Sequence, residues 1–167
     1  MCDGAGTCSA TPVINEIQTA GSTATDEFIE LYNPGSTAYP LASHALVYRS
    51  AIGATDVVLL SFTSQTIPAG GYFLAAGTGF TGTGADAVYT STPLSNLGGG
   101  VALRDPSGNI LDSVGYGTAT NSFVVVAPAP APPANKSIER LPDGTNSHNN
   151  FVDFVLSSAS TPKAMNH

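Results

Sequence analysis

The sequence predicts an all-β domain, a sandwich of about nine short strands with little or no helix. Charged residues make up only 10% of the chain, against roughly 25% in ordinary globular domains. Because Glu, Lys, Gln and Arg build most helix surfaces, a chain this poor in them has little surface helix. In addition, 18 glycines and 12 prolines punctuate the sequence. Short extended segments recur between these turn residues, as in a β-sandwich.

The first six extended segments are placed by the turn residues that end them. Asn33-Pro34-Gly35 stops the second segment, because Asn and Gly tolerate turn dihedrals and Pro presets one. A Pro-Gly turn at 67–71 leads into the fifth, and a Gly- and Thr-rich loop at 77–84 precedes the sixth. The six segments span residues 13–17, 27–33, 44–49, 57–62, 72–76 and 86–90.

The clearest hairpin in the sequence spans residues 101–114. Pro106 presets the first turn dihedral of its loop, and Gly108 can adopt the positive φ that closes the turn. Two last strands are expected at 136–141 and 151–156, and the chain is expected to fray from Ser157.

A single domain accommodates all of these segments, since 167 residues is an ordinary domain size. We predict a tail over 1–11, a domain over 12–156 and a C-terminal tail over 157–167. Within the domain, the Pro-rich stretch 127–135 is expected to form an exposed extended loop, because proline cannot donate ladder hydrogen bonds.

The charge balance excludes some partners. The net charge is −7, and only five Lys and Arg residues are scattered along the chain. Nucleic-acid binding draws its affinity from such cations, so we predict no direct nucleic-acid binding. No apolar run approaches the ~20 residues of a membrane span. An acidic surface of low charge fits an extracellular or cell-surface protein.

Two cysteines, Cys2 and Cys8, lie close together in a small-residue stretch at the N-terminus. In an oxidising compartment this spacing suits a small disulfide loop outside the core. The alternative is a pair of free thiols. The sequence opens without a signal peptide, and we expect a leader ahead of Cys2.

Several blocks, taken in order, resemble the lamin tail domain family. They are INEI at 14–17, EFIELYNPG at 27–35, IPAGGYFLAAG at 67–77 and LSNLGGGVAL at 94–103. SIER at 137–140 is similar to a closing segment of secreted bacterial members. The resemblance implies an immunoglobulin-like β-sandwich with a binding or architectural role. The heptad rod of nuclear lamins is absent, so we expect a monomer and no coiled-coil filament.

Motifs for catalysis are lacking, and we assign no catalytic residue. Glu27 and Glu30 flank an apolar strand, but their odd spacing puts them on opposite faces, so they cannot act as one acid/base pair. We interpret both as solvated or capping glutamates. His44 is interpreted as an ordinary residue at a strand start.

One stretch, 143–153, has the chemistry of a calcium loop. Asp143, Asn146 and Asp153 offer the hard oxygen ligands that calcium takes from flexible loops. The spacing does not match an EF-hand, and a plain turn is the alternative. We predict no other cofactor.

These observations favour a non-catalytic interaction module of a secreted or cell-surface bacterial protein. Its partner would be a protein or a cell-surface component. An accessory domain of a secreted hydrolase of the nuclease type, with the catalytic part outside this chain, is the alternative. Weaker alternatives are a calcium-dependent adhesion module and a small hydrolase in its own right.

Overall fold

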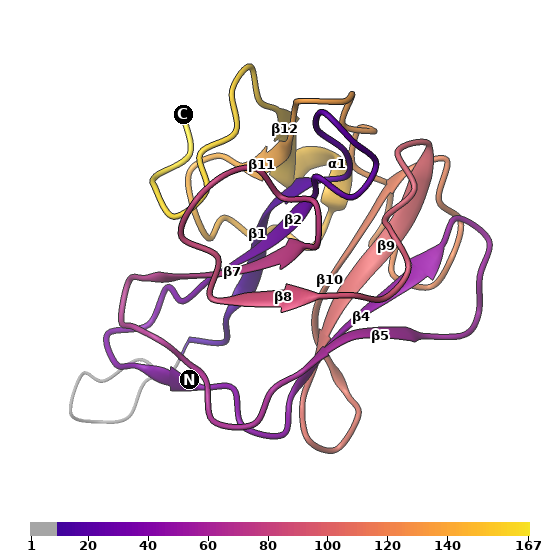
Figure 1. Ribbon diagram of the computed structural model, residues 1–167. Coiled ribbons are helices and arrows are strands. Elements are labelled where there is room, and N and C mark those ends of the chain that lie inside the picture. The colour runs from indigo at the N-terminus through magenta and orange to yellow at the C-terminus, as the bar shows by residue number, and fades with distance from the viewer. Residues whose placement is uncertain (1–9) are drawn as a thin grey trace.

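In the computed structural model, which describes residues 10–167, the chain forms two packed β-sheets and a short two-stranded ribbon (Figure 1). The larger sheet has the strand order β12-β11-β1-β2-β7-β8, and the smaller sheet has the order β10-β9-β4-β5. The strands pair antiparallel except β7 and β8, which are parallel. This architecture confirms the predicted all-β sandwich.

The strands are short, and the described residues contain one helical turn, α1 (Asn150–Asp153). The larger sheet consists of β1 (Val13–Gln18), β2 (Phe28–Tyr32), β7 (Tyr72–Gly77), β8 (Ala87–Tyr89), β11 (Ile138–Arg140) and β12 (Phe154–Leu156). The smaller sheet consists of β4 (Ala45–Ser50), β5 (Val57–Ser61), β9 (Gly98–Arg104) and β10 (Ile110–Gly117), and the ribbon of β3 (Tyr39–Pro40) and β6 (Thr66–Ile67).

The main core lies between the two sheets, because alternate residues of each strand face it. In β4, Leu46 and Tyr48 join this core, while the intervening Val47 packs on the other side of the sheet. There Val47 meets Ala102 and Phe123, so the outer side of the smaller sheet is also covered. Burial on both faces explains why β9 is small or apolar along most of its length. β1 is also buried throughout, but Asn15, Glu16 and Gln18 make half of it polar.

The predicted hairpin is confirmed as β9 and β10. Gly108 has a φ of +85° and donates its N–H to the Asp105 carbonyl at 2.9 Å. The predicted turn after β2 is confirmed as well. The buried Asn33 accepts from the Gly35 N–H and donates its side-chain amide to the carbonyls of Thr37, Ile67 and Pro68.

A second glycine, Gly117, lies at the end of β10. Adding a single methyl group at this position is expected to lower the stability of the domain strongly. The φ of Gly117 is +62°, and a Cβ would lie 2.2 Å from the Leu97 carbonyl oxygen. Gly117→Ala should therefore lower the free energy of unfolding by at least about 2 kcal/mol, as measured by urea denaturation. Gly108→Ala is the matched control, since its positive φ is similar but its Cβ would meet open space. Equal losses in the two variants would show that the contact with Leu97 is unimportant.

The Pro-rich loop is less exposed than predicted. Ala129 is buried and forms a parallel bridge with Tyr116. Its N–H donates to the Gly115 carbonyl and its carbonyl accepts from the Gly117 N–H. Proline lacks an N–H, but the alanines between the prolines retain theirs, and one of them pairs with the sheet.

The prediction of fraying from Ser157 is wrong. Residues 157–166 lie against the larger sheet, where the Thr161 N–H donates to Glu16 at 3.0 Å and the Lys163 N–H donates to Glu30 at 2.6 Å. Asn166 is buried and donates to the Arg140 carbonyl. The carboxyl groups on this face need hydrogen-bond donors, and the end of the chain supplies them.

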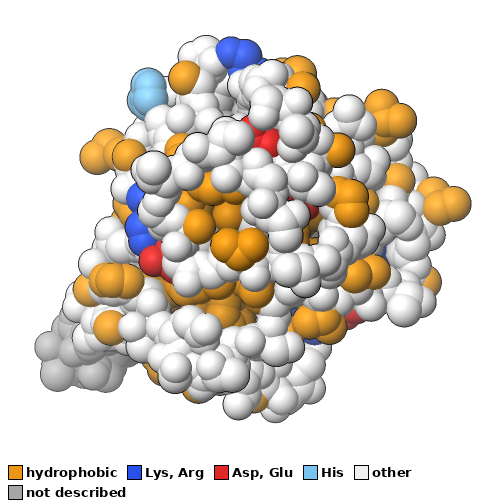
Figure 2. Space-filling model, viewed as in Figure 1, with side chains coloured by type: hydrophobic (Ala, Val, Ile, Leu, Met, Phe, Trp, Pro, Cys, Tyr) orange, Lys and Arg blue, Asp and Glu red, His pale blue; other side chains and the backbone are white. Residues whose placement is uncertain are grey.

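The surface carries few charges. Figure 2 shows a face that is mostly white, with apolar side chains in its middle, where Figure 1 places β7 and β8.

No helix among residues 10–167 is long and apolar enough to cross a membrane. The predicted disulfide between Cys2 and Cys8 lies outside the described residues.

Candidate functional site

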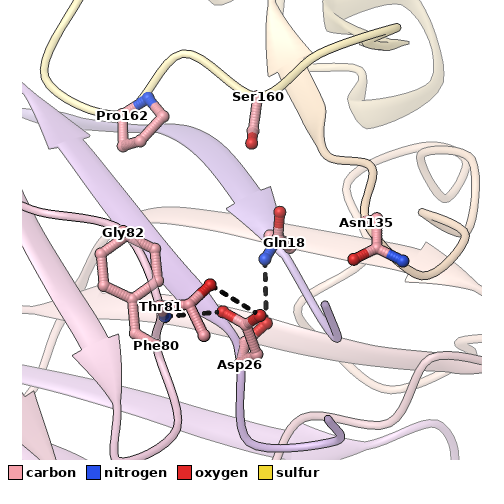
Figure 3. Close-up of a pocket in the computed structure, with 8 residues that line it drawn as sticks. All are labelled: Gln18, Asp26, Phe80, Thr81, Gly82, Asn135, Ser160 and Pro162. Atoms are coloured by element: carbon pink, nitrogen blue, oxygen red, sulfur yellow. Dashed lines mark hydrogen bonds between the residues drawn. The ribbon is translucent and has the colours of Figure 1, made fainter. Parts of the chain in front are cut away.

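A pocket of about 290 Å³ opens beside the end of β1. Segments far apart in the sequence contribute to it: β1, the loops before β2 and after β7, the end of the Pro-rich loop and the C-terminal segment (Figure 3). The lining residues are Gln18, Asp26, Phe80, Thr81, Gly82, Asn135, Ser160 and Pro162. No sequence pattern predicts this pocket, because its walls meet only when residues 157–166 pack on the sheet.

The polar groups at the base of the pocket are fixed in place. Asp26 is buried and accepts hydrogen bonds from the backbone and hydroxyl of both Ser22 and Thr81. Burial opposes ionisation of Asp26, yet these donors lower its pKa. The Gln18 amide nitrogen donates to the Asp26 carbonyl at 2.9 Å, which leaves Gln18 Oε1 turned toward the pocket (Figure 3).

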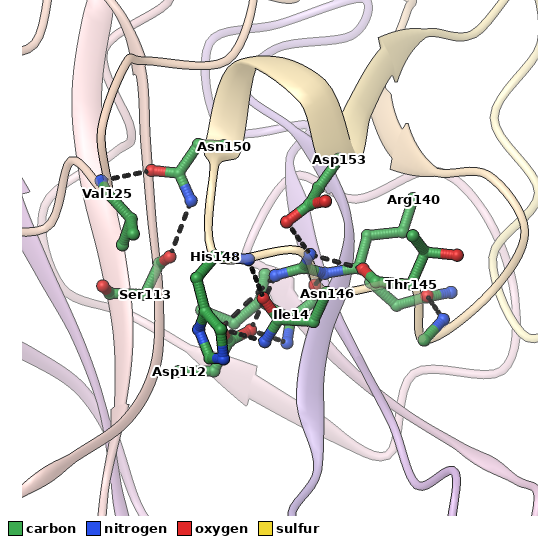
Figure 4. A network of polar contacts seen from close by, with 12 residues as sticks. Ile14, Asp112, Ser113, Val125, Arg140, Thr145, Asn146, His148, Asn150 and Asp153 are labelled. Atoms are coloured by element: carbon green, nitrogen blue, oxygen red, sulfur yellow. Dashed lines mark hydrogen bonds and ion pairs between the residues drawn. The ribbon is translucent and has the colours of Figure 1, made fainter.

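A second polar cluster surrounds Arg140, which is fully buried (Figure 4). Its guanidinium donates to the carbonyl of Ile14 at 2.8 Å and to that of Thr145 at 2.6 Å. It also forms ion pairs with Asp112 and Asp153, each at 3.1 Å. The side chain thereby ties together β1, β10, β11 and α1.

The two aspartates of this cluster differ in environment. Burial raises the pKa of Asp112, although Arg140 and the Ile14 N–H oppose the shift. Burial also disfavours the Asp153 anion, but hydrogen bonds from Ser147 and the charge of Arg140 outweigh it and lower the pKa of Asp153. Because the cluster is enclosed and its donors face its acceptors, its role is to hold the strands together.

The predicted calcium residues do not share one open site. Asp153 accepts from Arg140 and Ser147, and the side-chain Oδ1 of Asn146 accepts from the His148 N–H. Asp143 has other partners, including the Tyr72 hydroxyl at 2.5 Å. Among the described residues, no group of three or more His, Cys, Asp or Glu side chains is arranged to hold a metal ion.

We therefore expect thermal melts in millimolar calcium and in excess EDTA to superimpose. The Asp153 oxygens are already bonded to Arg140 and Ser147, so calcium would have to displace those donors. Calcium at 100 times its dissociation constant would add about 2.7 kcal/mol of stability. A rise in Tm that disappears in Asp143→Ala would contradict this expectation and restore the calcium loop.

The interpretation of Glu27 and Glu30 as solvated residues is wrong, since both are buried. Glu30 accepts from the Asn15 amide and the Lys163 N–H, whereas Glu27 accepts from the Leu94 N–H. Burial raises the pKa of Glu30 to about 8 and that of Glu27 to about 7. The two carboxyls have separate partners and do not converge on a shared space.

Glu30 instead faces Glu16, its register partner on β1, and Glu16 in turn pairs with Glu139 on β11. All three glutamates are buried. His44, also buried, contacts the Tyr39 hydroxyl and the Ala42 carbonyl. These contacts are local, and the geometry assigns none of these groups to an acid/base reaction.

Apolar side chains are exposed along the β12 edge of the larger sheet. We call this surface the β12 edge; it comprises Phe151 and Val152 of α1 and Val155 and Leu156 of β12, which are 64%, 63%, 41% and 51% exposed. β12 pairs with β11 and ends the sheet on this side. An exposed apolar edge strand is a ready template for another chain.

Comparison with known families agrees with this architecture. The family model of the Lamin Tail Domain matches residues 7–118, a span that runs from β1 to the end of β10. The members are immunoglobulin-like domains that are not enzymes, which fits the β-sandwich. A search of curated proteins gave no match. Since the match covers more than half of the chain, the protein belongs to the Lamin Tail Domain family.

Proposed function

We propose that this domain is a non-catalytic interaction module of a secreted or cell-surface bacterial protein, and that it binds a partner protein through the β12 edge. The exposure of four large apolar side chains within the six residues 151–156, at the end of the larger sheet, is the observation that carries the proposal. Burying such a patch stabilises association by roughly 25 cal/mol per Å² of apolar surface. The low charge of the chain supports an extracellular or cell-surface location.

The edge strand also supports a mode of binding. β12 can pair on its free side with an extended segment of the partner, as in β-strand addition. Main-chain hydrogen bonds would then supply affinity, and Val155 and Phe151 would supply side-chain contacts. Natural sheets often protect such an edge with lysine or proline, but β12 reads Phe154-Val155-Leu156.

Site-specific photo-crosslinking in cells that make the whole protein tests this proposal. A photoreactive residue in place of Phe151 should give a discrete adduct with a partner protein, and Val155→Lys should abolish that adduct. A photoreactive residue in place of Ile52 is the control, because Ile52 is 85% exposed but lies in the β4–β5 turn of the other sheet. Adducts of equal yield at both positions, or none at Phe151, would contradict the β12 edge as the binding surface.

A further inference from the structure

We propose that the pocket beside β1 binds one ring of a neutral sugar. This inference is independent of the β12 edge, since the two surfaces share no residue. It rests on which groups around the pocket remain free to meet a ligand, on the apolar wall of the pocket and on its size.

The charged groups around the pocket already have partners. Asp26 accepts from four donors of Ser22 and Thr81. Lys136, which follows the lining residue Asn135, donates its ammonium to the Ser158 carbonyl. Lys163, which follows Pro162, forms an ion pair with Asp86 at 2.7 Å. A charged ligand would have to break one of these pairs, whereas a neutral one need not.

The groups that remain are neutral and polar. Within residues 10–167, Gln18 Oε1, the Asn135 side-chain amide and the Ser160 hydroxyl form no hydrogen bond, while the Asn135 backbone N–H donates to the Ala20 carbonyl. Figure 3 shows Gln18 Oε1 and the Ser160 hydroxyl turned toward each other across the pocket, with Asn135 to one side. Gln18 is held by its bond to Asp26, so its free oxygen is a preset acceptor for a ligand hydroxyl. A side-chain amide also suits the neighbouring hydroxyls of a sugar, because the amide offers both an acceptor and donors.

One wall of the pocket is apolar. The ring of Phe80 is held edge-on against Phe28, with 5.6 Å between the ring centroids. Gly82 lies against the tip of the Phe80 ring, where a Cβ would approach within 2.4 Å. Pro162 lies above the ring in Figure 3. A ligand that suits this wall has a C–H face as well as hydroxyls, which is the chemistry of a pyranose ring.

The size of the pocket limits the ligand to one ring. Its volume of about 290 Å³ is at the lower end of the ~300–1,000 Å³ typical of small-molecule sites. A ligand this small, held by a few neutral hydrogen bonds, binds with a dissociation constant in the millimolar range. The pocket therefore fits a single residue of a glycan.

Amide NMR spectra of the nitrogen-15-labelled domain test the proposal. The protein is titrated separately with the methyl glycosides of glucose, galactose, mannose and N-acetylglucosamine. At least one glycoside should shift the amide signals of Gln18, Thr81, Gly82 and Asn135 in a saturable manner. Phe80→Leu keeps an apolar contact with Phe28 but removes the ring, and it should raise the dissociation constant about tenfold or more.

Asn135→Gly is the second variant, and it guards against misfolding because Asn135 has a φ of +60° that glycine adopts freely. It should weaken binding in the same way. His148→Gly is the matched control, an exposed residue with a φ of +59° that does not line the pocket, and it should leave the dissociation constant unchanged.

Three outcomes would overturn the proposal. One is the absence of saturable shifts with all four glycosides. Another is equal shifts with sorbitol, a polyol that has no ring face to lie on Phe80. The third is a stronger response to acetate or methylammonium than to any glycoside, which would assign the pocket to a charged ligand.

Discussion

Replacement of Arg140 with methionine is expected to lower the free energy of unfolding by about 3–5 kcal/mol, the typical effect of removing one partner of a buried ion pair. The variant would leave Asp112 and Asp153 buried without their shared cation. It would also remove the donors to the Ile14 and Thr145 carbonyls. Urea denaturation followed by circular dichroism measures the change.

Arg104→Met is the matched control. Arg104 pairs with Asp56, but Asp56 is partly exposed and keeps a second arginine, Arg49, at 2.6 Å. Ion pairs of this kind contribute about 0–1 kcal/mol. If the Arg140 and Arg104 variants lost the same stability, the enclosed cluster would have no special structural role.

The stability of the domain is expected to fall by roughly 6 kcal/mol as the pH rises from 5 to 8. Burial raises the pKa of Glu30 to about 8 and that of Glu27 to about 7, above the value of 4.5 of an unfolded glutamate. Between these values the folded state holds protons that the unfolded chain has released. The contribution is therefore complete below pH 4.5 and is lost as the pH rises through 7 to 8.

Glu30→Gln should flatten this profile and make the domain more stable than the unmodified protein at pH 8. At pH 5 the two should be alike, because the amide resembles the protonated carboxyl in shape and charge. Asp105→Asn is the control: Asp105 is partly exposed, and hydrogen bonds from Asn109 lower its pKa, so it titrates in the acid range. Parallel profiles for the Glu30 variant and the unmodified protein would contradict the assignment.

Local features of the fold could be predicted from the sequence because their causes lie close together in the chain. The 101–114 hairpin needs only Pro106 and Gly108 between two apolar runs, and the turn at Asn33 needs only Pro34 and Gly35 beside it. Both are confirmed. The blocks that resemble the lamin tail domain family occur in a fixed order along the chain. That order predicts that the local features combine into a β-sandwich.

The polar interior could not be predicted in this way. Glu16 and Glu30 are buried because a segment more than 130 residues further along the chain covers them. In the sequence, Arg140 is one of a few scattered cations. In the fold, its guanidinium donates to the Ile14 carbonyl, 126 residues away. The sequence suggests Asp153 as a calcium ligand because it does not reveal the ion pair with Arg140, which lies on another element. The residues of the candidate pocket carry no motif, since they come from five separate segments.

The position of β1 in the larger sheet has a consequence for the timing of folding. The first strand pairs on one side with β2 and on the other with β11, where Glu16 lies opposite Glu139, so the residues between these two positions must be synthesised before β1 has both neighbours. Contacts of such long range slow the folding of β-rich domains to milliseconds or longer. The larger sheet therefore cannot be completed until β11 has been synthesised.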